Sequence, residues 1–193
     1  ASLIARGGDM SGGGGRIETS AHKLKLEEIN IDTRAPKGKP GMWLIDPVDY
    51  TIANSGGDMT GKDLGDYLDR TDIKIKTIRS SDGISGTSGD INVNDSVTWG
   101  AATTLTLSAY RNININSTIK AEKGSVALEY GQRSTDGGYY FGLTSSGFAG
   151  KINLGTGSNF STKSGQALPV TYTVINSLSD LRDLALEIGR AHV

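Results

Sequence analysis

Five aspartates lie close together in one stretch of the chain, and carboxyl groups so grouped could do chemistry. They are Asp58, Asp63, Asp66, Asp69 and Asp72. Cleavage of a glycosidic bond needs two carboxyl groups that face each other across the substrate, and β-elimination needs a metal-bound acid cluster with a base. The same stretch is rich in Gly and contains Lys62, Arg70 and Lys74. We therefore expect a solvated loop whose aspartates cap turns, and we predict no catalytic residues and no enzyme.

Few residues could support other kinds of catalytic or metal site. The chain has no cysteine, which excludes disulfides and thiolate metal sites. Its two histidines, His22 and His192, lie near opposite ends of the chain, which disfavours a triad or a zinc site. The aspartate spacing does not match an EF-hand, and the Gly-Gly-Asp-Met repeated at 7–10 and 56–59 is not the calcium nonapeptide. We predict no metal and no cofactor.

A Gly-rich segment carries the aromatic residues that could bind a ligand. These candidate ligand-binding residues are Tyr139, Tyr140, Phe141 and Phe148. Aromatic rings offer a flat apolar face to a sugar and are common at binding surfaces. The alternative is a loop that folds over its own rings as a local cap. Both interpretations stay open on the sequence alone.

Overall composition excludes some partners. With 20 basic and 21 acidic residues the net charge is -1, and no long run of one sign occurs, so we expect no nucleic-acid partner. No stretch approaches the roughly 20 apolar residues of a membrane-spanning helix, so we expect no membrane insertion. The chain begins with Ala and opens in what resembles the middle of a repeat. We therefore expect an internal fragment whose export signal lies upstream.

Five short stretches share one pattern, in which Gly, Asp or Asn precedes apolar residues at every second position. They are residues 15–20, 89–94, 111–116, 124–129 and 150–154. Apolar residues spaced by two bury one face of an extended strand. The steps from Ile73 to Ile91, Ile91 to Ile113 and Leu107 to Leu128 are 18, 22 and 21 residues. We predict a stacked solenoid with one coil per stretch.

The same alternation separates an interior from a surface. We expect Ile91, Ile113 and Val126 to share a dry interior, with consecutive turns in register. Five asparagines occupy the alternate, outward positions, where we expect polar ladders and no ligand site. They are Asn92, Asn94, Asn112, Asn114 and Asn116.

The pattern also predicts the organisation of the chain. Residues 1–165 should form an all-β, parallel solenoid with two excursions at about 54–72 and 133–150. Leu64, Tyr67 and Leu68 have the spacing of one helical turn that could cover the flank of the coil. Residues 166–186 should form a strand and a short helix that begins with a capping box at Ser177 to Asp180. Residues 187–193 resemble a translated sequencing adapter, and we expect a non-native tail.

Several of these stretches, in this order, resemble one family. They are residues 14–20, 43–47, 105–109 and 112–116, followed by Ile119. The chain resembles the filamentous-haemagglutinin-like adhesins, which are exoproteins of bacterial two-partner secretion. The resemblance covers roughly residues 7–178. It implies a right-handed parallel β-helix within a long surface fibre, exported through a partner barrel in the outer membrane of a Gram-negative bacterium.

The resemblance also implies a function. The family's fibre region carries no catalytic residues, and its secretion domain, which engages the outer-membrane transporter, does not lie in these residues. We expect a structural and adhesive segment at the bacterial cell surface, whose partners are host or bacterial surface glycans or proteins. Two alternatives remain open. One is a secreted carbohydrate-active β-helix enzyme, a polysaccharide lyase or hydrolase, and the other is the stalk of a contact-dependent toxin.

Overall fold

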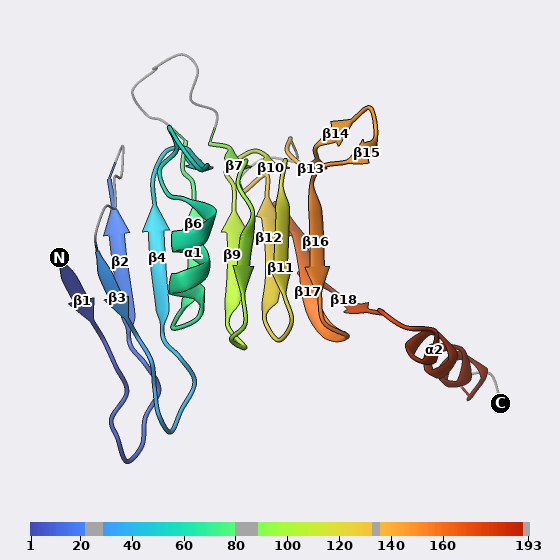
Figure 1. Ribbon diagram of the computed structural model, residues 1–193, viewed down its shortest axis with the longest axis horizontal. Coiled ribbons are helices and arrows are strands. Elements are labelled where there is room, and N and C mark those ends of the chain that lie inside the picture. The colour runs from blue at the N-terminus through green and yellow to red at the C-terminus, as the bar shows by residue number, and fades with distance from the viewer. Residues whose placement is uncertain (22–28, 80–88, 133–135, 191–193) are drawn as a thin grey trace.

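The protein is built mainly of parallel β-strands that lie side by side along its long axis. A computed structural model describes residues 1–21, 29–79, 89–132 and 136–190. The predicted all-β class and the mostly parallel sheets are confirmed. The two ends of the chain lie at opposite ends of the molecule, so the strands succeed one another from the amino to the carboxyl end (Figure 1).

The largest sheet, here the long sheet, follows the molecule from end to end. Its parallel strands are β2 (Arg16–Ser20), β4 (Met42–Asp46), β6 (Asp72–Lys76), β9 (Thr104–Ser108), β12 (Ser125–Tyr130) and β17 (Gly157–Ser164). A last strand, β18 (Val170–Val174), pairs with β17 in the antiparallel sense. Because β18 is antiparallel to β17, it covers the edge of the long sheet at which a further parallel strand would pair.

Two shorter parallel sheets complete the stack. The second sheet contains β5 (Tyr50–Ile52), β7 (Ile91–Val93), β10 (Ile113–Ile115) and β13 (Tyr139–Phe141). The third sheet contains β8 (Val97–Trp99), β11 (Thr118–Ala121) and β16 (Lys151–Leu154). The other elements are the parallel pair β1 (Ser2–Ile4) and β3 (Asn30–Asp32), the hairpin β14 (Leu143–Thr144) and β15 (Gly147–Phe148), and the helices α1 (Gly61–Leu68) and α2 (Leu178–Arg190).

The chain visits the three sheets in a fixed order. From β7 it passes to β8 and β9, then to β10, β11 and β12, and then to β13, β16 and β17. Each of these turns therefore adds one strand to each sheet. The prediction of one coil per sequence stretch was wrong, because the five stretches fall on all three sheets and one turn takes three strands.

The register explains which of the predicted steps hold. Ile91 pairs with Ile113, and Leu107 pairs with Leu128, so the steps of 22 and 21 residues are confirmed. The step from Ile73 to Ile91 was wrong, because the strand partner of Ile73 is Leu105 in the long sheet, whereas Ile91 belongs to the second sheet. The steps are near-constant only where no insertion lengthens a turn.

Inward side chains of the three sheets form one apolar core. One column of the long sheet runs through Ile17, Trp43, Ile73, Leu105, Val126 and Phe160. Ile91 and Ile113 are fully buried, and Val126 is 1% exposed in the same core. The shared interior is therefore confirmed, although only Ile91 and Ile113 are in register with each other, because Val126 belongs to the long sheet.

Outward asparagines form the predicted ladder. The Asn114 side-chain amide donates to the Asn92 side-chain oxygen at 2.8 Å, one turn away. Asn116 donates to Asn94 in the same way, also at 2.8 Å. Because each amide both donates and accepts, a column of asparagines satisfies its polar groups along the stack.

Helix α1 confirms the predicted helical turn and packs against the edge of the third sheet. Leu64 and Leu68 are fully buried in the core, four residues apart on one helix face. A Cβ atom at Gly65 would lie 2.3 Å from the Thr98 carbonyl oxygen of β8. On the other side, the Tyr67 hydroxyl donates to the Ile29 carbonyl, next to β3. The helix thus lies between the pair β1 and β3 and the third sheet.

The other predicted segments also have definite outcomes. Of the excursion expected at 133–150, the described residues include β13, which pairs in register with β10, and the hairpin at 143–148, which departs from the sheets. The expected strand and helix are β18 and α2, and Ser177 and Asp180 exchange the hydrogen bonds of a capping box. Among the described residues, no helix is both long and apolar enough to cross a membrane. The end of the suspected tail, 191–193, lies outside the described residues.

Candidate binding surface at the carboxyl end of the stack

Strand β13 divides the predicted aromatic residues between the core and the surface. Tyr139 and Phe141 pair with Ile113 and Ile115 and face the core, where their ring centroids lie 6.0 Å apart in an edge-to-face arrangement. Burial raises the pKa of the Tyr139 hydroxyl. Tyr140, between them, is 56% exposed. The alternation of a strand accounts for this division.

Further rings join the two inward residues at the same end of the core. Tyr130 lies 5.5 Å from Tyr139 between ring centroids, and Phe160 lies 5.6 Å from Tyr172 of β18. We call these five rings the aromatic cap: Tyr130, Tyr139, Phe141, Phe160 and Tyr172. Tilted and edge-to-face ring pairs of this kind are favourable beyond the area they bury. The cap therefore closes the last turn of the core, next to the reversed strand β18.

The hairpin β14 and β15 projects from the end of the second sheet (Figure 1). Leu143 and Phe148 are cross-strand partners, and they are 69% and 61% exposed. At the base of the hairpin the Ala149 amide donates to the Gly142 carbonyl at 2.8 Å, and the Gly142 amide donates to the Ile115 carbonyl of β10 at 2.7 Å. These backbone bonds tie an apolar, exposed tip to the rigid sheet. We call Tyr140, Leu143 and Phe148 the hairpin surface.

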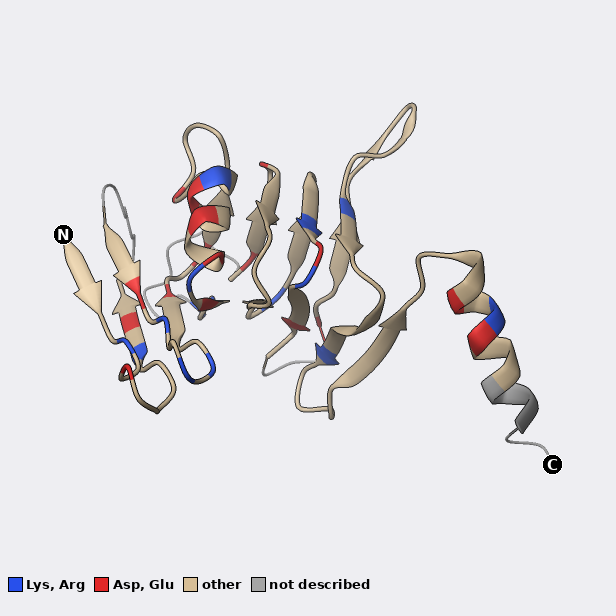
Figure 2. Ribbon diagram, turned by 60° about the horizontal axis from the view of Figure 1, so that its bottom comes forward, with Lys and Arg blue, Asp and Glu red and all other residues tan. Residues whose placement is uncertain are grey.

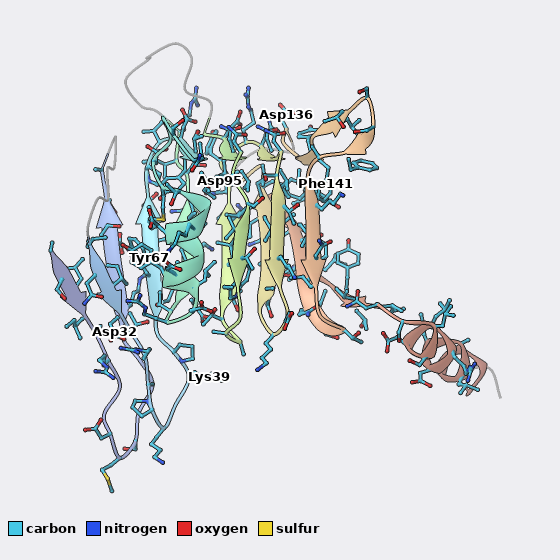
Figure 3. The ribbon with its side chains drawn as sticks, viewed as in Figure 1. Asp32, Lys39, Tyr67, Asp95, Asp136 and Phe141 are labelled. Atoms are coloured by element: carbon cyan, nitrogen blue, oxygen red, sulfur yellow. The ribbon has the colours of Figure 1, made fainter. Side chains whose placement is uncertain are left out.

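The four predicted ligand-binding residues thus divide into two pairs. Tyr139 and Phe141 belong to the aromatic cap, but they lie on the sheet strand β13 and not on a loop folded over its own rings; Figure 3 labels Phe141 at this end of the molecule. Tyr140 and Phe148 are exposed and belong to the hairpin surface. Ligand binding by this surface stays a prediction. Leu143 is its third large apolar side chain, which an aromatic count of the sequence omits.

The five clustered aspartates each have a structural partner. Asp69 accepts from the backbone amides of Gly100 and Ala101, at 2.8 and 3.1 Å. Asp72 accepts from the Thr104 amide at 2.8 Å, and burial raises the pKa of its carboxyl. The remaining three bind Thr51, Thr60 and Lys62. The expected solvated loop was wrong, because residues 61–68 form helix α1, whereas Asp63 and Asp69 do hold the ends of this helix and a neighbouring turn.

No group of three metal-ligating side chains is found within the described part of the chain. His22 and His192, the candidate histidines, lie outside it. The aspartate cluster, which suggested calcium or catalysis, is distributed over helix α1, strand β6 and the segments beside them, and each carboxylate has a protein partner.

A polar groove on the outer face of the long sheet was missed by the sequence argument. Its volume is about 170 Å³, and it brings Lys74, Lys76 and Lys163 around Glu129. The Lys74 ammonium lies 2.7 Å from the Glu129 carboxylate, and Ser108 also donates to it at 2.7 Å. Burial raises the pKa of Glu129, but these hydrogen bonds outweigh burial and hold the pKa below its usual value.

This groove does not supply the residues that glycosidic cleavage needs. Glu129 is its one carboxyl group among the described lining residues, whereas hydrolysis requires a pair, one of which donates a proton. A carboxyl group with a lowered pKa is also a poor general acid. The sequence could not indicate the groove, because its residues come from separate turns, and Lys74 and Glu129 lie 55 positions apart.

Comparison with models of known protein families, with curated proteins and with solved structures found no match to this chain. Any function must therefore be argued from the arrangement of its own residues.

Proposed function

We propose that the chain is a segment of a right-handed parallel β-helix, and that it serves as a structural and adhesive part of a large, secreted bacterial surface exoprotein. The observation that carries this proposal is the in-register column of inward side chains along the long sheet, from Ile17 to Phe160. Parallel strands joined by crossovers are right-handed in nearly all proteins, which supports the proposed hand.

A coil of this kind is suited to the role of a spacer. Neighbouring strands in a sheet are about 4.8 Å apart, so each turn lengthens the rod by that distance. Continuous backbone hydrogen bonds and the apolar core both propagate along the axis. A long array of such turns would hold a distal region away from the cell.

The adhesive role belongs to the hairpin surface. The hairpin presents Leu143 and Phe148 to solvent and the adjoining strand β13 presents Tyr140, while Tyr139 and Phe141 belong to the aromatic cap. A rigidly held, exposed ring loses little conformational entropy on binding. The surface suits the flat apolar face of a glycan or an apolar patch on a host or bacterial surface protein.

The export route is also part of the proposal. The chain's resemblance to filamentous-haemagglutinin-like adhesins suggests passage through an outer-membrane transporter, engaged by a secretion domain outside these residues. The lack of cysteine suits a chain that crosses a membrane unfolded. We do not favour the carbohydrate-active enzyme, since each of the five clustered aspartates already has a protein hydrogen-bond partner and Glu129 is held by Lys74.

A binding experiment tests the adhesive role. The purified chain would be applied to a glycan array and to cultured host and bacterial cells, together with a Tyr140→Ser, Phe148→Ser double variant. We expect the double variant to lose at least about tenfold in affinity, as truncation of central aromatic residues does.

A Leu168→Ser variant is the matched control, because Leu168 is 86% exposed and lies in the turn before β18, outside the hairpin surface. It should bind like the wild type, and all variants should keep the urea midpoint of the wild type. Equal binding by the double variant, or the lack of any bound glycan or cell, would refute the adhesive role.

A further inference from the structure

Positive charge gathers near the amino end of the stack, far from the hairpin surface. Arg6 follows β1 by two residues, Arg34 follows β3 by two, and Arg70 follows α1 by two. Lys37 and Lys39 lie in the loop after Arg34. We call these five residues the basic corner. Figure 2 shows blue segments at this end of the molecule, and Figure 3 marks Lys39 and Asp32 there.

The fold brings the three arginines together although they are far apart in sequence. The parallel backbone ladder of β1 and β3 continues beyond the strands, because the Ala5 amide donates to the Asp32 carbonyl and the Gly7 amide to the Arg34 carbonyl, both at 2.9 Å. Arg6 and Arg34 are therefore cross-strand neighbours. Arg70 donates to the Asn30 side chain at 3.4 Å, which places the end of α1 beside β3.

The arginines of the basic corner already bind one buried carboxylate, that of Asp32. The Arg34 guanidinium binds Asp32 with two hydrogen bonds, at 2.9 and 2.6 Å, and Arg6 lies 3.6 Å from the same carboxylate. The Asp32 side chain is only 8% exposed, whereas those of Arg6 and Arg34 are 49% and 52% exposed. Two guanidiniums thus share one carboxylate and keep much of their surface in solvent.

A groove of about 380 Å³ lies between these arginines. Arg6, Arg34 and Arg70 line it, and Asp69 is the one carboxylate in its lining, with an oxygen already held by two backbone amides. Its remaining lining is formed by small apolar residues such as Pro36 and Ala101, together with Thr103. Because Asp32 beside the groove already pairs with Arg34 and Arg6, three guanidiniums face two carboxylates, and the groove combines one net positive charge with an apolar floor.

This chemistry favours a peptide over a sugar. Guanidinium groups match carboxylates in a bidentate manner, and the apolar floor suits short apolar side chains. A saccharide needs side-chain groups that bind hydroxyls and a ring on which to stack. Among the described lining residues there is no aromatic ring and no side-chain amide, and the Thr103 hydroxyl already donates to the Leu68 carbonyl.

We propose that the basic corner is a docking groove for an acidic peptide segment of a partner protein, with carboxylates on Arg6 and Arg70 and apolar side chains on the floor. The groove lies at the opposite end of the stack from the hairpin surface, so this inference does not depend on the adhesive role.

Fluorescence anisotropy tests the groove. The probe is a labelled decapeptide of alternating Glu and Leu, compared with its Gln and Leu counterpart. We expect the full chain to bind the Glu peptide with an affinity that falls as salt rises and to bind the Gln peptide at least about tenfold more weakly. Arg70→Gln and Arg6→Gln should each weaken binding about tenfold, the usual effect of losing a charged hydrogen bond. Arg34 is left intact because it partners the buried Asp32.

Lys120→Gln is the matched control, because Lys120 is an exposed cation on the third sheet. It should bind the peptide like the wild type, as should the Tyr140→Ser, Phe148→Ser variant that tests adhesion. Should Arg70→Gln lower the urea midpoint, Arg6→Gln alone decides, and an unchanged affinity in that variant overturns the proposal.

Three results would each overturn the proposal. The first is no binding of the Glu peptide, the second is equal binding of the Gln peptide, and the third is an unchanged affinity in both arginine variants. Heparin and polygalacturonate are added as competitors. If either displaces the peptide at a lower concentration of charge than the free peptide does, the groove recognises polysaccharide and the peptide proposal is wrong.

Discussion

Replacing Ile113 with alanine should destabilise the protein far more than replacing its neighbour Asn114 with alanine. Ile113 is fully buried at the centre of the second sheet, between Ile91 and Tyr139 on the adjacent turns. Asn114 lies on the same strand but faces outward, where it donates one hydrogen bond to Asn92. The two substitutions therefore probe the two faces of one strand.

The expected sizes of the two effects follow from these surroundings. Ile113→Ala removes three buried carbons, which at about 0.8 kcal/mol each is about 2.4 kcal/mol of transfer free energy. The cavity left between two rigid turns raises the expected loss to about 3 to 4 kcal/mol. Asn114→Ala removes one partly exposed hydrogen bond, for which we expect about 1 kcal/mol or less.

Urea unfolding followed by tryptophan fluorescence measures both losses. Trp43 and Trp99 are buried in different sheets, at 0% and 3% exposure, so they report on separate parts of the stack. Both should show the same transition, with a lower midpoint in Ile113→Ala. A loss below about 1 kcal/mol for Ile113→Ala, or a larger loss for Asn114→Ala, would refute the assignment of inner and outer faces.

Two further predictions concern the helix and the buried aspartate. Gly65→Ala should destabilise the protein by about 1 to 3 kcal/mol despite the better helix propensity of alanine, because the new Cβ would meet the Thr98 carbonyl. Thermal unfolding of this variant is compared with that of Asp66→Ala, a substitution at the exposed neighbour. Equal midpoints of the two variants would contradict the prediction. The Arg34 guanidinium beside Asp32 lowers the pKa of that carboxyl from 3.8 to about 2. A lowered folded-state pKa stabilises the protein above the unfolded pKa, so this contribution is lost as pH falls from about 4 to about 2. The difference in unfolding free energy between wild type and Asp32→Asn should shrink across that window, and a constant difference would count against the ion pair.

Strand alternation could be predicted from the sequence because it is local. One buried face is indicated within a few residues by apolar pairs such as Ile91 and Val93, or Ile113 and Ile115. The outward positions of the asparagines follow from the same alternation. The helical turn at Leu64 and Leu68 was predictable for the same reason, since its spacing is contained in one segment.

Which strands become neighbours could not be predicted, because insertions vary the length of each turn. Ile73 lies 18 residues before Ile91, yet its strand partner is Leu105, 32 residues away. Clusters that depend on such pairings were hidden for that reason, including the groove around Glu129 and the basic corner around Arg6, Arg34 and Arg70.

The aromatic segment shows a second limit of prediction from the sequence. Its composition allowed both a sugar-binding loop and a local cap, and the strand register that separates the two roles was not evident in this Gly-rich segment. Once β13 pairs with β10, Tyr139 and Phe141 must face inward while Tyr140 faces outward. Composition identified the residues, whereas only the pairing separated their roles.

Disulfide trapping tests the central claim, that successive turns stack as parallel strands in register. The chain has no cysteine, so an engineered pair gives an unambiguous crosslink. Asn92→Cys with Asn114→Cys joins residues that are direct partners in β7 and β10, about 4.8 Å apart between Cα atoms and within reach of a disulfide. Asn92→Cys with Asn116→Cys is offset by two residues, about 8 Å, which is too far. We predict rapid crosslinking of the first pair and little of the second under mild oxidation, and faster crosslinking of the offset pair would contradict the stacked register.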